Sequence, residues 1–230
     1  MTSEIMNRNS PFSYHCNACG RCCFNKQIQT NPYEVLRLAR NLGMKTGDFA
    51  RQYLDKEGPY LRVTEEGACI FLDNKGCSVH KDRPIACRTW PLGRWVSAKY
   101  EETYRELKPH PESEGIYGQD GTVGQFLTAQ GVLPYLEAAD RYQSLFYRMF
   151  DALQQVLPTD SSLPGNVQDA MFKKNQEGTP AFLEWLDVDS TVEIYCAEHN
   201  LVPPDAIDET VDFHIQAIDQ WLDSQSGGTP

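Results

Sequence analysis

The chain has 230 residues, and its 21 Lys and Arg stand against 32 Asp and Glu, which gives a formal net charge of −11. Nucleic-acid-binding domains normally carry a basic surplus, so this total argues against nucleic acid as a partner. No run of eighteen apolar residues is present, which excludes a membrane-spanning helix from the expected architecture.

The charges and the cysteines are divided unevenly along the chain. Residues 1–110 hold 17 Lys and Arg and 12 Asp and Glu, a net of +5, whereas residues 111–230 hold 4 and 20, a net of −16. Seven of the eight cysteines lie in the first half, and only Cys196 lies in the second. Such asymmetry indicates two functionally different parts. We therefore expect a cysteine-cluster metal-binding module over 1–118 and an acidic helical region packed on it over 119–230.

The expected elements of the first part are short. Asn31 is a good helix cap, Pro32 suits the first helical position, and Gly43 ends the helix. The turn signal Asp73-Asn74-Lys75-Gly76 predicts a hairpin flanked by cysteines. The expected elements are helices at 32–43 and 47–54, strands at 60–63, 68–72 and 77–79, a helical turn after Pro84 that carries Cys87, and a loop at 108–121.

The second part is expected to be mainly α-helical, which gives an α+β fold class for the whole chain. Thr122 caps a helix, and the longest helix runs from Leu133 to Leu157. Its apolar residues recur at alternating steps of three and four, which predicts core packing, with a homodimer seam as the alternative. These residues are Ala139, Tyr142, Phe146, Met149, Leu153 and Val156. The expected helices are 123–130, 133–157, 166–175, 180–186, 189–199 and 205–223. His214 on the last helix is expected to be packed or half-exposed rather than a ligand.

The dense cysteine set is the main chemical signal of the sequence. The N-terminus has no apolar segment typical of a secretory signal, so we expect a cytoplasmic protein whose thiols stay reduced and serve as metal ligands rather than disulfides. Thiolates select zinc, copper(I) or iron–sulfur clusters. Three convergent thiolates plus one distant thiolate are the ligand pattern of a ferredoxin-type 4Fe-4S cluster, and four thiolates suit zinc equally well. The predicted ligands are Cys16, Cys19, Cys22, Cys23, Cys69, Cys77, Cys87 and His80.

The adjacent pair Cys22-Cys23 leaves the number of sites open. Side chains of neighbouring residues usually diverge, so we expect one metal ion not to take both sulfurs. Seven cysteines and His80 make eight ligands, which is enough for two sets of four. The alternative is a single site that leaves Cys23 as a buried structural thiol.

Basic residues lie among the predicted ligands. Nearby cations stabilise thiolates and can tune a cluster. Arg83 and Arg88 bracket the turn that carries Cys87, and they are the predicted cofactor-binding side chains. Lys26 and Lys75 are expected to be ordinary surface cations.

Two segments, CNACGRCC at 16–23 and ACIFLDNKGCSVHKDRPIACRTWPLGR at 68–94, carry a family resemblance. They resemble the CxxCxxCC family of zinc- or iron-chelating domains (YkgJ-like cysteine-cluster proteins). The resemblance is close over about 14–95 and looser through HPESEG and Thr122–Tyr135, and Ser113 stands where longer members carry a further cysteine. It implies that the cysteines chelate zinc or iron, and some relatives are described as iron–sulfur proteins.

Three functional hypotheses follow. The first is a metal-binding protein, of iron–sulfur type, with a redox, metal-handling or cluster-dependent modification role. The second is a structural zinc module whose acidic helical region binds a protein partner. The third is an enzyme, but no phosphate loop, GxSxG, HExxH or CxxxCxxC pattern is present, so a catalytic activity would depend on a cluster.

Overall fold

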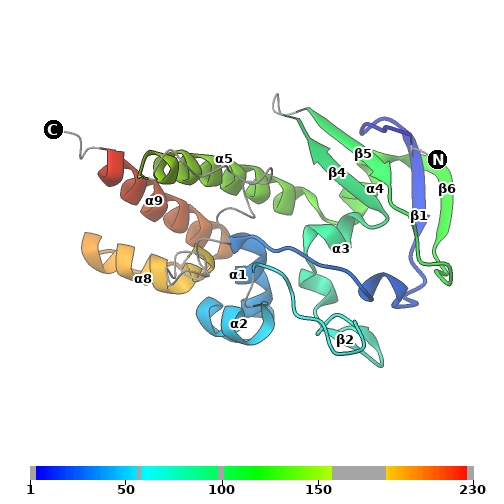
Figure 1. The fold of residues 1–230 in the computed structure, drawn as a ribbon, viewed down its shortest axis with the longest axis horizontal. Coiled ribbons are helices and arrows are strands. Elements are labelled where there is room, and N and C mark those ends of the chain that lie inside the picture. Colours follow the sequence, from blue (N-terminus) through cyan, green and yellow to red (C-terminus); the bar gives the residue numbers. More distant parts are fainter. Residues whose placement is uncertain (1–3, 56–57, 98–100, 157–184, 227–230) are drawn as a thin grey trace. The chain divides into compact units, whose positions relative to one another are not determined.

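The computed structural model describes two compact units, each made of two chain segments (Figure 1). The cysteine unit comprises Met1–Gln29 and Leu61–Leu136, and the helical unit comprises Thr30–Tyr60 and Glu137–Pro230. Helices and small antiparallel sheets together confirm the α+β class. The boundary expected at residue 118 differs from this division, which groups residues 30–60 with the C-terminal helices. The described residues are 4–55, 58–97, 101–156 and 185–226, with the side chains of 149–156 and 225–226 left out.

The cysteine unit contains three two-stranded antiparallel sheets and short helices. Strand β1 pairs with β6, β2 with β3, and β4 with β5. The strands are β1 (Pro11–His15), β2 (Leu72–Asp73), β3 (Gly76–Cys77), β4 (Leu92–Val96), β5 (Glu102–Glu106) and β6 (Ile116–Thr122). The helices are the 3-10 turns η1 (Arg21–Cys23) and η2 (His80–Asp82) and the α-helices α3 (Ile85–Thr89) and α4 (Val123–Ala129).

Strand β6 replaces the C-terminal part of the loop expected at 108–121, whereas 108–115 lack a helix or strand, as expected. Tyr14 lies opposite Tyr117, with ring centroids 5.0 Å apart, so the strand is held by a partner far away in sequence. Gly118 is typical of a turn in the sequence. In the structure it lets β1 and β6 approach closely, since a Cβ at this position would lie 2.7 Å from Ser13 Oγ. Local sequence could not show that pairing.

The hairpin and the helix starts follow the sequence more closely. Leu72 pairs with Cys77 around the predicted turn, which confirms the hairpin. Between residues 60 and 71, however, the expected strands shrink to isolated bridges, including that of Val63 with Cys69. Thr122 caps α4 in a capping box with Gln125, as the cap signal predicts.

Five helices form the described part of the helical unit: α1 (Pro32–Asn41), α2 (Thr46–Tyr53), α5 (Leu133–Val156), α8 (Val188–His199) and α9 (Ile207–Ser226). Helix α5 begins in the cysteine unit and continues into the helical unit. Asn31 and Glu34 form a capping box at the start of α1, which confirms the predicted start. The helix expected at 166–175 and most of the one at 180–186 lie outside the described residues.

The buried face of α5 is offset from the predicted seam. Tyr135, Ala138, Tyr142 and Leu145 are buried, at steps of three and four, whereas Ala139 and Phe146 of the seam are only half-buried. The periodicity therefore predicted core packing correctly. Tyr142 belongs to both sets, but the buried residues Ala138 and Leu145 each lie one position before the predicted Ala139 and Phe146.

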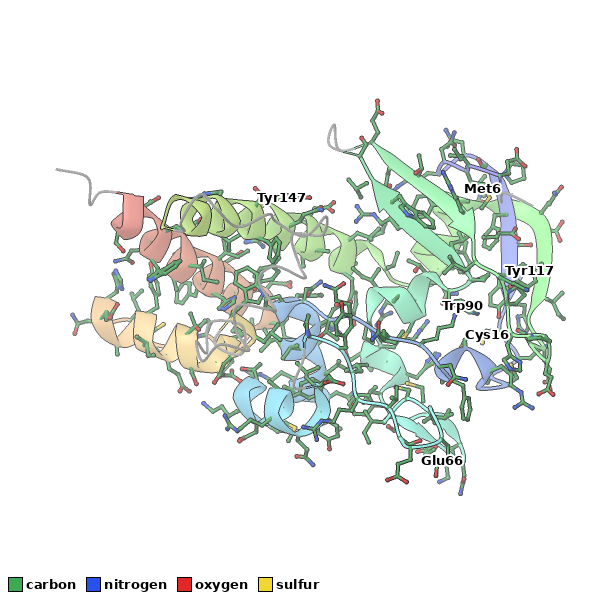
Figure 2. All side chains as sticks on the ribbon, viewed as in Figure 1. Met6, Cys16, Glu66, Trp90, Tyr117 and Tyr147 are labelled. Carbon is green, nitrogen blue, oxygen red and sulfur yellow. The ribbon has the colours of Figure 1, made fainter. Side chains whose placement is uncertain are left out.

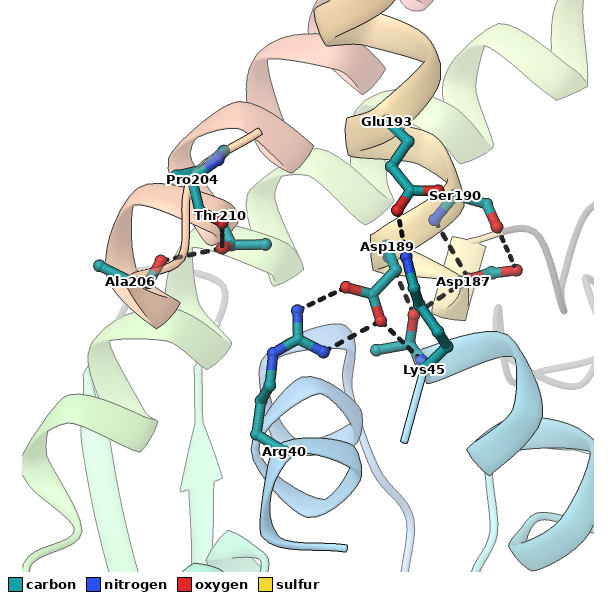
Figure 3. A network of polar contacts seen from close by, with 10 residues as sticks. Arg40, Lys45, Asp187, Asp189, Ser190, Glu193, Pro204, Ala206 and Thr210 are labelled. Atoms are coloured by element: carbon teal, nitrogen blue, oxygen red, sulfur yellow. Dashed lines mark hydrogen bonds and ion pairs between the residues drawn. The ribbon is translucent and has the colours of Figure 1, made fainter. Parts of the chain in front are cut away.

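A polar network joins α1, α2 and α8 (Figure 3). Arg40 donates two hydrogen bonds to the carboxylate of Asp189, at 3.1 and 2.5 Å. The same carboxylate accepts the backbone N–H of Thr46 at 2.7 Å. Because Asp189 is buried, this pairing compensates for the loss of its hydration. Lys45 pairs with the exposed Glu193 at the rim of the network.

His214 is fully buried in the helical unit. Its Nδ1 lies 3.0 Å from the hydroxyl of Tyr142, and its ring packs near Trp185. Its Nε2 is buried and has no hydrogen-bond partner among the residues that the structure describes. Burial lowers the pKa of His214 to about 3, so the imidazole is neutral at neutral pH. This placement agrees with the expectation of a packed histidine.

None of the helices in the described ranges has the length and apolar character needed to cross a membrane.

Candidate metal centre

All seven predicted cysteine ligands lie in the cysteine unit, and their thiols are free. Cys16 is exposed and the other six are half-buried, so the sulfurs are accessible from solvent yet partly shielded. Cys196 differs in both respects, since it is buried in α8 of the helical unit. The separation of seven cysteines from the eighth, predicted from their spacing, therefore holds in space.

Backbone pairing brings distant cysteine segments together. The N–H of Cys69 donates to the carbonyl of Cys23 at 2.8 Å, and Asn25 N–H donates to Gly67 O at 2.8 Å. Phe24 and Ala68 form the bridge between these two contacts. The CNACGRCC run thus lies directly beside the chain that leads into the hairpin.

Local conformation of the run explains where its sulfurs lie. Ala18 has a φ of 54°, and its N–H donates to Cys16 Sγ at 3.4 Å. Gly20 has a φ of 71°, which glycine adopts without strain, and its carbonyl accepts the N–H of Cys23 to close the 3-10 turn. This turn places the Cys22 and Cys23 sulfurs 4.0 Å apart. The expectation that these neighbouring side chains diverge was therefore wrong, although the number of metal sites stays open.

The paired thiols do not share charge equally. The hydrogen bond with Cys23, assisted by the cations Lys26 and Arg83, lowers the pKa of Cys22. The same hydrogen bond and burial raise the pKa of Cys23. Cys22 is therefore the first of the pair to become a thiolate, which is the form that binds metal.

The other thiols belong to the same electrostatic neighbourhood. Cys87 and Cys69 also contribute to the raised pKa of Cys23. Burial is the main reason that the pKa values of Cys69 and Cys77 are raised, and Cys22 adds to both. Thiols from the run, the hairpin and α3 therefore interact with one another.

The donors are gathered but not fully converged. Within the described residues, no three His, Cys, Asp or Glu side chains come together closely enough to hold one metal ion. Coordination by three or more of these thiols therefore requires side-chain rotation or closure of the surrounding turns. The donor set itself, soft and deprotonatable, suits zinc or iron.

His80 lies in η2, three residues after Cys77, and it is exposed. Its Nδ1 is 3.3 Å from the guanidinium of Arg83. Burial and the charges of Arg83 and Arg88 lower its pKa, so the imidazole is neutral at neutral pH, as a metal ligand must be. Its role as a ligand stays a prediction.

The two predicted cofactor-binding arginines are used differently. Arg88 is buried, and it donates to the carbonyls of Arg83 and Gln130 at 2.9 Å and to the Tyr135 hydroxyl at 2.7 Å. It thereby ties the helix that carries Cys87 to the end of α4. Arg83 donates to Gln130 Oε1 at 2.8 Å and interacts electrostatically with Cys87, Cys77 and Cys16. Of the two arginines, Arg83 thus interacts electrostatically with the thiols, whereas Arg88 holds α3 against the end of α4.

Lys26 is the residue that sequence reasoning missed. It was expected to be an ordinary surface cation, but its Nζ lies 2.8 Å from the ring centroid of Trp90. The only sequence signal is position, since Lys26 comes three residues after Cys23 and Trp90 three residues after Cys87. Figure 2 labels Trp90 and Cys16 in the cysteine unit.

The HPESEG segment also lies against the cysteine run. Arg21 pairs with Glu112 at 2.8 Å, and Asn17 Nδ2 donates to the carbonyl of Glu114 at 2.7 Å. Ser113 hydrogen-bonds Tyr14, whose pKa is raised mainly by burial, with contributions from Cys16 and Cys22. Ser113 therefore lies near the cysteine run, although it cannot supply a thiolate.

Residues 15–109 match the model of the CxxCxxCC family, whose description reads "putative zinc- or iron-chelating domain". This stretch of the chain is similar to CxxCxxCC domains. The match contains all seven clustered cysteines and His80, which supports metal binding. The matched stretch ends before α4, which belongs to the same compact unit and whose C-cap residue Gln130 accepts a hydrogen bond from Arg88. No curated protein and no solved structure matched the chain.

Proposed function

We propose that the cysteine unit binds a metal centre through its cysteine thiolates and that this centre is an iron–sulfur cluster of the 4Fe-4S type. The observation that carries the proposal is the pairing of the CNACGRCC run with the Cys69 segment, through the Cys69 N–H and the Cys23 carbonyl. It brings the backbone of the run, with its closely spaced cysteines, beside that of a distant cysteine, and closely spaced thiolates plus a distant one are the ligand pattern of ferredoxin-type clusters.

The residues fit such a centre by their chemistry. Cys16, Cys19 and Cys22, which are grouped by their spacing in the sequence, are the candidates for three positions, and Cys69, Cys77 and Cys87 are the distant candidates for the fourth. The backbone N–H of Ala18 donates to a sulfur of the run, a type of contact that tunes cluster potentials. When bound, a cluster supplies one-electron exchange, which supports a redox, metal-handling or modification role.

A structural zinc site is the second candidate, because one specific distance favours it. A tetrahedral zinc site with Zn–S bonds of about 2.3 Å places its sulfurs about 3.8 Å apart. The Cys22–Cys23 separation of 4.0 Å is close to that edge. Zinc held there would stabilise a region with little regular secondary structure of its own and would carry no redox chemistry.

Anaerobic purification followed by metal and sulfide analysis distinguishes the two candidates. Iron with acid-labile sulfide and broad visible absorption would support the cluster. A colourless protein with stoichiometric zinc, whose cysteine unit unfolds on chelation, would support the zinc module. Substitution Cys19→Ser should lower metal content in either case, and unchanged content would contradict the role of the run.

We further propose that the protein acts in the cytoplasm and that the helical unit carries a surface for a protein partner. Part of the acidic charge is already paired within this unit, since Arg141 contacts Asp212 at 2.6 Å. The carboxylates left for a basic partner are therefore fewer than the number of acidic residues indicates. A pull-down with the intact chain, repeated at high salt, tests whether charge drives such an association.

A further inference from the structure

One contact in the cysteine unit joins two cysteine segments without involving a cysteine. Lys26 follows the CNACGRCC run, and Trp90 follows Cys87 at the end of α3. The Lys26 ammonium lies over the Trp90 ring at 2.8 Å from its centroid, and the indole is only 9 % exposed. A buried aromatic face thus fixes the position of a flexible cation between the two segments.

The acidic side chains that interact electrostatically with Lys26 are thiols. Among the described residues, no carboxylate forms an ion pair with Lys26, whereas Arg21, Arg40 and Arg94 each have a carboxylate partner. Burial lowers the pKa of Lys26, and Cys22, Cys87 and Cys23 oppose that effect. Those three thiols come from both segments that the Lys26–Trp90 contact joins.

Other cations near the thiols have competing contacts. Arg88 is held by carbonyl groups and the Tyr135 hydroxyl. Arg83 donates to Gln130 and to the carbonyl of His80. An ammonium group on an aromatic face is held there without a neutralising anion, so its charge can act on neighbouring thiolates.

We propose that Lys26, held in place by Trp90, is a positioning residue that balances the charge of the thiolates of Cys22, Cys23 and Cys87 and thereby strengthens their binding of metal. The inference rests on the proposed metal-binding function and takes these three cysteines as neighbours of one cation. Accumulated thiolate charge limits the affinity of such a site, and a fixed cation offsets part of that repulsion.

The test compares two variants. Lys26→Met keeps an apolar stem against Trp90 but removes the positive charge, whereas Lys26→Arg keeps the stem and the charge. Lys75→Met in the exposed hairpin turn is the matched control. Zn²⁺ affinity is measured by competition with a chromophoric chelator from about pH 6 to about pH 9. We expect Lys26→Met to weaken binding by about ten- to a hundredfold, the range typical of residues that support ligands, and to move the pH midpoint of binding upward. Lys26→Arg and Lys75→Met should bind like the wild type.

Equal binding by Lys26→Met and the wild type across that range would overturn the proposal. Equal loss in Lys26→Met and Lys26→Arg would also overturn it, because the role would then be packing rather than charge. A second measurement, the alkylation rate of the metal-free thiols, separates this inference from the proposed function. Slower alkylation of Lys26→Met near neutral pH, with equal rates in alkali, supports the cation role even if the wild type binds no Zn²⁺. Identical rates at both pH values would contradict it.

Discussion

Two groups of ionisable side chains in this chain are shielded from water, and their charges are compensated in different ways. In the network of α1, α2 and α8, the Asp189 carboxylate meets the guanidinium of Arg40 and the N–H of Thr46 (Figure 3). In the cysteine unit, half-buried thiols interact with one another and with the cations Lys26 and Arg83, and burial raises the pKa of Cys69 and Cys77. In the first arrangement the charges are paired within the protein, which supports stability. The second arrangement brings together thiols that can serve as ligands for a metal centre.

The largest effect is expected from changing one thiol of the close pair. Cys22→Ser should reduce bound metal to about a tenth or less and lower the melting temperature of the cysteine unit, because structural metal binding contributes directly to folding. Metal analysis and circular dichroism measure the two effects. Cys196→Ser is the matched control, since this cysteine is buried in the other unit and should leave metal content unchanged. Equal metal content in Cys22→Ser and the wild type would show that the pair is not a ligand group.

Acid should weaken the helical unit through His214. Its folded pKa is about 3, below the usual value of about 6.5, so the unfolded chain binds the proton more readily. The free energy of unfolding should therefore fall as pH decreases from about 6.5 to about 3, by on the order of 4 kcal/mol, and be unaffected by this group above that window.

Denaturant unfolding at several pH values, read out by the fluorescence of Trp185 and the other tryptophans, measures this dependence. His214→Gln keeps a group able to bond the Tyr142 hydroxyl but does not titrate, so its profile should be flatter. Parallel profiles for the two proteins would refute the assignment.

A smaller effect is expected from the polar network. Asp189→Asn removes the charge that pairs with Arg40 and should destabilise the helical unit by about 2 kcal/mol. This value lies below the range for fully buried pairs because the Arg40 side chain is 36 % exposed. Chemical denaturation should detect the loss while metal content stays constant. A change in metal content would mean that the two regions are coupled.

The smallest effect is expected at the rim of that network. Glu193→Gln removes the partner of Lys45, and both side chains are more than half exposed. Such pairs contribute at most about 0.5 kcal/mol, so unfolding curves of the variant and the wild type should nearly superimpose. A loss as large as that of Asp189→Asn would show that charge alone, rather than burial, determines the stability of the network.

The sequence predicts elements best where local residues determine them. The cap residues Asn31 and Thr122 marked the starts of α1 and α4 correctly, and each forms a capping box in the structure. Strand β6 could not be predicted, because its order comes from pairing with β1 about a hundred residues earlier and its glycines resemble a turn. Residues 30–60 were assigned to the cysteine part for the same reason, since their grouping with α8 depends on long-range contacts such as Arg40–Asp189.

The candidate site shows the same limit. Spacing identified the seven clustered cysteines and set Cys196 apart. Spacing did not show that a 3-10 turn directs Cys22 and Cys23 to the same side, because that depends on the conformation of Gly20. The stacking of Lys26 on Trp90 joins residues more than sixty positions apart, so no local pattern could indicate it.

The number of metal atoms per chain in anaerobically purified protein is the most direct test of whether the clustered cysteines hold a metal centre. We expect a stoichiometric amount of iron or zinc in the wild type and in Cys196→Ser, and its loss in Cys22→Ser. A folded wild-type protein without metal that also fails to take up added iron or zinc under reducing conditions would contradict it.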